Sequence, residues 1–324
     1  MTQSARSTAD GAVASANLLF HLHARPCPVC GNTNDAHELY PQHLDPARID
    51  GMSYASRKEP EYMSLRMVVC PECELLYAPQ IPSADFLTRA YADTGYDSDS
   101  EARQAAASYA QALAGRMDLL PDRTAALEVG AGNGALLFHL RALGFTQVIG
   151  IEPSRDAALS AAPDLRELIR VESFDAARLP KAHFSLIIAN QTLEHIDEPY
   201  RFLSAARTLL KPGGAVMIVS HNYRHWLMRL LGARSPIIDI EHLQVFSPAS
   251  LSYALQRAGF AAPNIGPFAN CYPLHYWIRL VPIPRALKRP LHAWLRNSAG
   301  GGIGGMMLRA SVGNMLAWAH APIL

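Results

Sequence analysis

The sequence lacks any uninterrupted run of about eighteen apolar residues, which is the length that a membrane-spanning helix requires. Its first stretch, MTQSARSTADGAVASANLLFHLHARP, also lacks the long apolar core and cleavage pattern of a secretory signal, so we expect residues 1–24 to form a flexible tail. An excess of one charge is absent too, since 29 basic and 28 acidic residues leave a formal charge of +1. That balance gives no electrostatic footprint for a long phosphate backbone. We therefore expect a cytoplasmic globular protein with no nucleic-acid partner. The sequence does not indicate the oligomeric state.

Cysteine is scarce, but four of the five cysteines form two paired CPxC units. The pairs are Cys27 with Cys30 and Cys70 with Cys73. In a reducing compartment such pairs hold a metal more often than they form disulfides. Together they would supply the closed tetrahedral thiolate shell of structural Zn²⁺, and a pair of redox dithiols is the alternative. We predict a small zinc-ribbon domain over residues 25–85, with metal binding coupled to its folding.

The pattern changes beyond the second cysteine pair. An alanine-rich stretch predicts a helical connector over residues 86–120. From Thr124 on, short apolar runs such as AALEVG, QVIGIEP, FSLIIAN and AVMIVSH alternate with amphipathic segments, and GNMLAWAH is expected to be the last strand. This alternation is typical of a parallel sheet wrapped in helices, so we predict an α/β domain over residues 121–324.

The stretch LEVGAGNGALLFHL places Glu128 and three alternating glycines, Gly130, Gly132 and Gly134, between a predicted strand and a predicted helix. Such a turn lets main-chain amides and the positive end of a helix approach a ligand, and NAD, FAD and S-adenosylmethionine (SAM) all use it. The spacing GxGxG differs from the GxGxxG of nicotinamide folds, which argues against NAD. Glu152, at the end of the next strand, would accept ribose hydroxyls in either NAD or SAM.

These residues belong to a longer series of motifs. The series comprises ExGxGxG from Glu128, the acid Glu152, ARLP at 177–180, LEHIDEP at 193–199 and LLKPGG at 209–214. In this order and spacing the chain resembles the class I SAM-dependent methyltransferases over about residues 121–262 and the last strand. The resemblance implies a Rossmann-like, doubly wound sheet with SAM as the cofactor.

The same resemblance implies a set of cofactor contacts. The glycine amides would face the methionine part of SAM, and the acid after the second strand would face the ribose. A Ser-Phe pair would lie beside the adenine, and an Asn-Gln pair would lie near the transferable methyl. The last pair follows the fourth strand, where open α/β sheets place their chemistry. The residues concerned are Glu128, Gly130, Gly132, Gly134, Glu152, Ser173, Phe174, Asn190 and Gln191.

A narrower likeness concerns the acceptor. The CPxC units ahead of the methyltransferase motifs, together with EHLQVFSP at 241–248, are similar to bacterial enzymes that methylate sugars and other small metabolites. In that group an acid-histidine pair faces the substrate, so Glu241 and His242 are candidate bases. Asp239 stands where the group often has a tyrosine. The alternatives are a zinc-ribbon RNA methyltransferase and an inactive protein that kept the fold as a binding module.

Methyl transfer from a sulfonium needs alignment and, where required, removal of a proton, a task that suits a histidine. His242 is the first candidate, and its alternative role is to fix a loop by hydrogen bonding. His195, within LEHIDEP, and His221, directly after the fifth strand, are further candidates. His195 could instead order the strand-to-helix turn.

Residues 266–312 are expected to form a C-terminal insertion before the last strand. Arginines and lysines alternate with tryptophans over residues 277–296, a pattern that fits an amphipathic face resting on anionic lipid headgroups. The alternative is a substrate lid with a solvated basic face.

Overall fold

The structure is a computed structural model that describes residues 22–34, 36–283, 285–298 and 302–323. Most of the expected tail at 1–24, and part of the glycine run at 300–305, lie outside the described residues. Within the described residues, no helix combines the length and the apolar character that crossing a bilayer would take.

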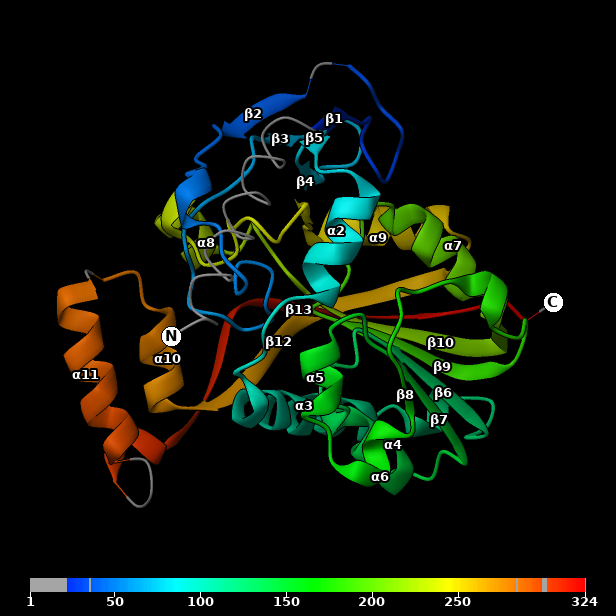
Figure 1. Ribbon diagram of the computed structural model, residues 1–324. Coiled ribbons are helices and arrows are strands. Elements are labelled where there is room, and N and C mark those ends of the chain that lie inside the picture. Colours follow the sequence, from blue (N-terminus) through cyan, green and yellow to red (C-terminus); the bar gives the residue numbers. More distant parts are fainter. Residues whose placement is uncertain (1–21, 35, 284, 299–301, 324) are drawn as a thin grey trace.

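A seven-stranded sheet forms the centre of the molecule, in the order β12-β13-β10-β9-β6-β7-β8 (Figure 1). Five of its strands are parallel, and β13 and β12 add to one edge in antiparallel fashion. The parallel strands are β6 (Ala125–Val129), β7 (Gln147–Ile151), β8 (Ile169–Arg170), β9 (Phe184–Asn190) and β10 (Leu210–His221); the edge strands are β12 (Ala261–Pro273) and β13 (Met307–His320). The predicted α/β fold is therefore confirmed, although the sheet is mixed.

Side chains that alternate along the central strands fill two separate cores. In β6, Ala125, Leu127 and Val129 face one layer of helices, and Ala126 faces the other. The first layer holds α7 (Pro199–Leu209) and α9 (Pro248–Arg257); the second holds α3 (Asp99–Ala114), α4 (Ala135–Ala142), α5 (Arg155–Leu159) and α6 (Pro163–Arg166). Burial of both strand faces explains why these runs are continuously apolar in the sequence.

One strand of the large sheet is absent from the sequence-based prediction, and another is counted there without bounds. The latter is β8, the third parallel strand along the chain, which has only two residues, too few for a periodic pattern. The strand β12 carries three prolines and several exposed positions, so it does not read as an apolar run. Both ends of the range 266–312 are strand, and the inserted part consists of α10 (Leu274–Leu280), α11 (Arg285–Asn297) and the turn after them. The predicted last strand is confirmed within β13.

The N-terminal module has its own antiparallel sheet in the order β11-β4-β3-β2. Three of these strands precede the methyltransferase motifs: β2 (His37–Tyr40), β3 (Met67–Val69) and β4 (Leu76–Tyr77). The fourth, β11 (Gln244–Val245), lies much later in the sequence, between β10 and α9, and pairs with β4. A short pair, β1 (His23–Ala24) with β5 (Gln80–Ile81), and the helix α2 (Ala84–Ala92) complete this part. One sheet is thus shared between the cysteine-containing module and the segment that follows Glu241 and His242.

Arg25 stabilises the same junction through hydrogen bonds. Its guanidinium donates to the carbonyl oxygens of Ala78 at 2.9 Å, Asp197 at 2.7 Å and Leu243 at 2.8 Å, and to Gln244 Oε1 at 3.1 Å. These acceptors come from both parts of the molecule. One side chain therefore satisfies several main-chain oxygens that would otherwise be buried without a donor.

We predict that Arg25→Met lowers the free energy of unfolding by about 2–4 kcal/mol, because several carbonyls lose a charged donor. Urea denaturation followed by circular dichroism measures this change. Arg201→Met is the matched control, since the Arg201 side chain is 78% exposed and pairs only with Glu198 at the surface. Its expected cost is below about 0.5 kcal/mol, and equal costs for the two variants would contradict the proposed role of Arg25.

Candidate active site

The glycine-rich turn leads from β6 into α4 and forms the floor of a cavity. Gly130, Gly132 and Gly134 have φ angles of 77°, 55° and 72°, in the left-handed region that glycine tolerates. A Cβ on Gly130 would lie 2.3 Å from Thr192 Oγ1. The backbone conformation therefore favours glycine at all three positions, and lack of space requires it at Gly130. These glycines leave the main chain open toward the cavity.

The acid at the end of β7 is held beside this turn. Glu152 Oε2 accepts from the Gly132 N–H at 2.7 Å, and Oε1 accepts from the Ser154 N–H at 2.8 Å. Burial raises the pKa of Glu152 above its ordinary value, and the two main-chain donors oppose that shift. The carboxylate is thus oriented by the backbone on the two strand-to-helix turns that flank the cofactor position.

Glu128, at the end of β6, is the second acid at this end. It is only 5% exposed, and its Oε2 has no hydrogen-bond partner within the described residues. Burial and the nearby charge of Glu152 raise its pKa well above the ordinary range. An unpaired buried carboxyl oxygen is costly, which makes it a candidate for contact with a cationic ligand group.

All of the predicted cofactor residues except Gly134 line a single cavity of about 660 Å³. At Gly134, an added Cβ would point toward Ile169, Leu137 and Leu165. Ser173 and Phe174 form part of its wall, and Asn190 and Gln191 lie where β9 ends. Asn190 Oδ1 accepts from the Val219 N–H at 3.1 Å, which leaves Nδ2 without a partner among the described residues.

Three histidines predicted from the sequence meet at the other end of the cavity. The ring of His242 lies 4.9 Å from that of His195 and 5.3 Å from that of His221, measured between centroids. The Nδ1 atoms contact Ile237 O at 3.0 Å for His242, Glu241 O at 2.9 Å for His195 and Asn314 Oδ1 at 2.9 Å for His221. Because these oxygens only accept, each Nδ1 carries the proton and each Nε2 is left as an acceptor.

The histidine cluster is neutral at physiological pH. Burial lowers the pKa of His221 to about 4, that of His195 below its ordinary value and that of His242 well below it. The rings also disfavour one another's protonation, since a charge on one opposes a charge on the next. The arrangement can accept a proton at one Nε2, and the resulting cation would be short-lived.

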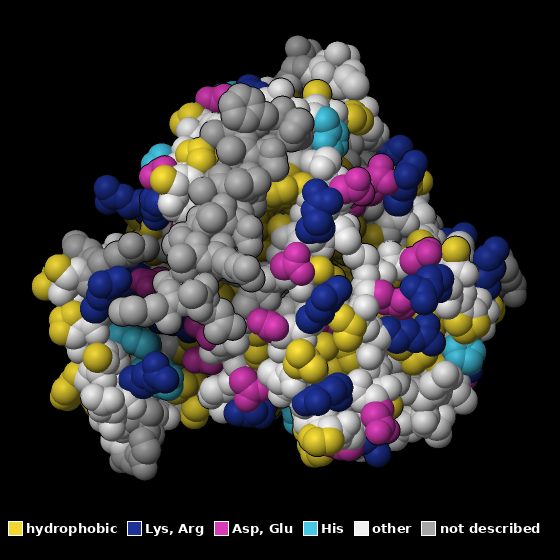
Figure 2. All heavy atoms as spheres, viewed as in Figure 1, with side chains coloured by type: hydrophobic (Ala, Val, Ile, Leu, Met, Phe, Trp, Pro, Cys, Tyr) yellow, Lys and Arg dark blue, Asp and Glu magenta, His cyan; other side chains and the backbone are white. Residues whose placement is uncertain are grey.

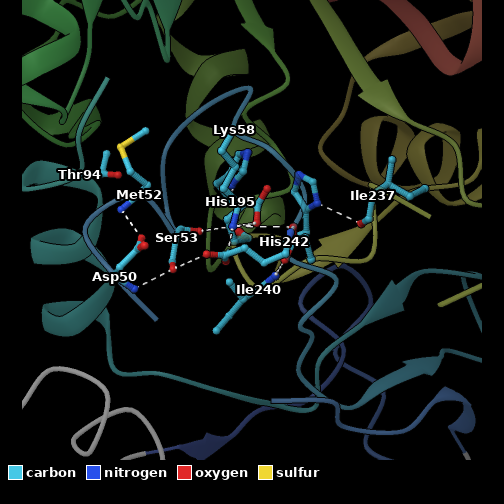
Figure 3. Close-up of polar contacts among 12 residues, drawn as sticks. Asp50, Met52, Ser53, Lys58, Thr94, His195, Ile237, Ile240 and His242 are labelled. Atoms are coloured by element: carbon cyan, nitrogen blue, oxygen red, sulfur yellow. Dashed lines mark hydrogen bonds and ion pairs between the residues drawn. The ribbon is translucent and has the colours of Figure 1, made fainter. Parts of the chain in front are cut away.

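Glu241 and His242 do not pair with each other. The Glu241 carboxylate instead contacts Lys58 Nζ at 3.1 Å, and the same ammonium lies 2.8 Å from Glu61 Oε2 and 3.7 Å from Asp239 Oδ2 (Figure 3). Lys58 also donates to Ser53 O at 2.6 Å, and its side chain is 5% exposed. One buried cation thus faces three carboxylates, beside the histidine cluster.

The carboxyl groups of this network retain protons more readily than free ones. Burial, followed by the charge of Glu241, raises the pKa of Asp239 to about 7, and the nearby ammonium of Lys58 opposes the shift. Burial also raises the pKa of Glu241. Sequence reasoning missed Lys58, because it lies in the loop between the cysteine pairs and nothing local in SRKEP marks it as buried.

The four paired cysteines meet in the N-terminal module. Their Sγ atoms all lie within 4.8 Å of one another, with 3.5 Å between Cys27 and Cys73 and 3.4 Å between Cys30 and Cys70. Main-chain bonds shape each CxxC turn, such as Gly31 N–H to Cys27 O at 2.8 Å and Glu74 N–H to Cys70 O at 3.0 Å. Four convergent thiols of this kind fit a tetrahedral metal ion.

Comparison with known proteins agrees with this geometry. The sequence profile of the methyltransferase domain family matches residues 98–262. Among curated proteins, the chain is 24% identical to a ubiquinone biosynthesis O-methyltransferase of Acinetobacter baylyi, over 47% of this chain and 70% of that protein. It is 30% identical to the Rhodopseudomonas palustris protein of the same name, over 33% of this chain and 44% of that protein, so it spans less than half the length of this second relative.

Solved structures show distant similarity. A SAM-dependent methyltransferase from Archaeoglobus fulgidus is 17% identical with a TM-score of 0.43, covering 65% of this chain and 94% of that one. Phosphoethanolamine N-methyltransferase 2 of Haemonchus contortus, in complex with SAM, is 14% identical with a TM-score of 0.43, covering 66% of this chain and 52% of that one.

The family match spans more than half of the 324 residues and includes the glycine turn, Glu152 and the end of β9. The chain therefore belongs to the methyltransferase domain family and is a SAM-dependent methyltransferase.

Proposed function

We propose that the protein transfers the methyl group of SAM to a small molecule, namely a sugar, a glycan precursor or another natural product. The observation that carries this proposal is the continuity of one cavity, which joins the glycine turn and Glu152 to the three clustered histidines. Its volume of about 660 Å³ lies in the range of small-molecule sites. The names of the curated relatives favour an oxygen atom as the acceptor.

The residues of the glycine turn fit SAM. The open main chain at Gly130 and Gly132 would lie along the methionine part, Glu152 would accept the ribose hydroxyls, and Ser173 with Phe174 would border the adenine. Asn190 and Gln191 would lie near the reacting methyl. SAM itself supplies an activated methyl on a sulfonium, so the protein's task is to align the acceptor, exclude water and accept a proton.

His242 is the base that we propose. Its Nδ1 is fixed by Ile237 O, so its Nε2 is the lone pair that a hydroxyl acceptor would meet. His195 and His221 flank it and would orient the same proton by hydrogen bonding. The carboxyl group of Glu241, with Asp239 behind it, would then serve as the neighbouring proton store that Lys58 holds in place.

We propose that the four cysteines bind one structural Zn²⁺ ion, for which four convergent thiols are a fitting donor set. The ion would fix the two CxxC turns and, through β4 and β11, the segment that carries Glu241 and His242.

We also propose that α11 contacts an anionic lipid surface. The helix has four basic residues and no acidic one. Leu287, Leu291 and Trp294 are spaced as one helical stripe and are 65%, 38% and 60% exposed. Arg289 and Arg296 are also exposed and form a basic stripe on the same helix. Figure 2 shows hydrophobic side chains along the outer edge of the part of the molecule formed by α10 and α11.

The cavity does not account for this stripe. Tyr276, Trp277 and Leu280 of α10 line the cavity, as a lid would, whereas none of the described side chains of α11 does. An apolar stripe beside a basic one is typical of helices that lie in a membrane interface. The two roles considered for the insertion, a substrate lid and a membrane contact, are therefore compatible.

For the catalytic role, we predict that His242→Ala lowers kcat by about 10²- to 10⁴-fold, the usual contribution of a general base. The assay is release of S-adenosylhomocysteine with sugar and phenolic acceptors. Affinity for S-adenosylhomocysteine, measured by calorimetry, should stay unchanged. His139→Ala in α4, away from the cavity, is the control, and a His242→Ala protein with full turnover would remove the assignment.

For the metal, we predict one zinc ion per chain in the purified protein, and loss of that ion in Cys27→Ser. Elemental analysis gives the stoichiometry, and a chelator should lower the melting temperature of the wild type but not that of Cys27→Ser. Cys271→Ser is the matched control, because Cys271 is half-buried in β12, outside the cysteine cluster. The site would be refuted if the wild-type protein contains no metal and its melting temperature does not change with a chelator.

For the lipid contact, we expect co-sedimentation with vesicles of phosphatidylcholine and phosphatidylglycerol, but weak binding to phosphatidylcholine alone. Leu287→Glu with Trp294→Glu should abolish it. Leu159→Glu, at a side chain that is 60% exposed on α5, should not. Unchanged sedimentation of the double variant, or a change in its oligomeric state without lipid, would contradict the proposal.

A further inference from the structure

Arg57 enters the cavity from the loop between the two cysteine pairs. It lies next to Lys58, but its side chain serves a different part of the cavity wall. Its φ angle is 56°, in the left-handed region that residues with a Cβ rarely adopt. The loop therefore takes a strained conformation at the residue that supplies this guanidinium.

The guanidinium faces hydroxyl groups rather than carboxylates. Apart from burial, the strongest electrostatic effects on the pKa of Arg57 come from four phenol groups. They belong to Tyr272, Tyr109, Tyr276 and Tyr96. All four line the same cavity. They come from α3, β12, α10 and the segment before α3, so chain regions far apart in sequence converge on one cation.

Within the described part of the chain, no carboxylate lies within ion-pair distance of Arg57. The neighbouring carboxylates Glu61, Asp239 and Glu241 are all taken by Lys58. The hydroxyls of Tyr96 and Tyr109 are buried without a geometric hydrogen-bond partner among the described residues. A cation inside a cavity, beside hydroxyls with free donors, is incomplete without an anion.

Two acids at the glycine turn share the cavity with Arg57. Glu128 and Glu152 both sense the charge of Arg57 without pairing with it. Glu128 also has the unpartnered Oε2 described above. A free cation and a free carboxyl group that line one cavity are complementary to a zwitterion, with an ammonium at Glu128 and a carboxylate at Arg57.

We propose that Arg57, with the hydroxyls of Tyr96 and Tyr109, forms a subsite for an anionic group of a bound ligand. The arrangement favours the α-carboxylate of the methionine part of SAM. A carboxylate or phosphate on the acceptor has the same chemistry and is the second source. The inference rests on the proposed function for the identity of the ligand, and it assigns to the N-terminal module a direct part in binding.

The test compares two ligands that differ in the amino-acid end. S-adenosylhomocysteine carries the aminocarboxylate, and 5′-methylthioadenosine retains the nucleoside and sulfur without it. With the full chain, we expect Arg57→Ala to weaken S-adenosylhomocysteine at least about tenfold in calorimetry and to leave 5′-methylthioadenosine unchanged. Tyr109→Phe should give a smaller loss in the same direction.

Arg66→Ala is the control, since Arg66 belongs to the same module and pairs with Glu38 at the surface. Circular dichroism verifies that each variant is folded. If Arg57→Ala leaves S-adenosylhomocysteine unaffected, inorganic phosphate is titrated into the protein saturated with S-adenosylhomocysteine. Phosphate binding that Arg57→Ala abolishes assigns the subsite to the acceptor.

The proposal is overturned if Arg57→Ala changes neither S-adenosylhomocysteine nor phosphate binding while the wild type binds S-adenosylhomocysteine. Equal weakening of S-adenosylhomocysteine and 5′-methylthioadenosine would also overturn it, because the loss would then not concern the anion. Failure of the wild type to bind either nucleoside would instead refute the proposed function, so the two failures are distinguishable.

Discussion

The contact between Lys58 and the carboxylates around Glu241 sets the geometry of the end of the cavity that holds the three histidines. A buried ammonium with three carboxylates tolerates little displacement, because losing either sign would leave charge unpaired in a poorly hydrated place. Hydrophobic packing of Ile237, Ile240 and Leu243 against the N-terminal module supports the same segment. The positions of Glu241 and His242 thus depend on a module that the family match does not include.

The two ends of the cavity differ in how they are stabilised. At the end with the glycine turn, main-chain amides of adjacent turns orient Glu152, so this part of the cavity follows directly from the sheet. At the histidine end, side chains from distant segments balance one another through charge and hydrogen bonds. With the pKa of Asp239 at about 7, this end gains or loses a proton near neutral pH, while the histidines stay neutral. Such an environment suits proton movement better than permanent charge.

Local sequence patterns predicted the parts of the structure that local constraints create. The glycine turn, the buried strands and the cysteine pairs each have a short-range physical cause. No short-range cause exists for the contacts of Lys58 with Asp239 and Glu241, or for those of Arg57 with the tyrosines, because these partners lie tens to hundreds of residues away. The strand β12 was missed for another reason: it pairs along the sheet edge, where its prolines are tolerated and its exposed positions need not be apolar.

The shared strand β11 has a consequence for any attempt to divide the protein. Within the described residues, the edge of β4 that faces away from β3 is covered by two residues of β11, which lie inside the methyltransferase match at 98–262. A fragment that ends near residue 85 would expose that edge, with free amides and carbonyls ready to pair with another chain. The N-terminal part is therefore expected to aggregate when produced alone, and grafting it onto another enzyme would require carrying Gln244 and Val245 along with it.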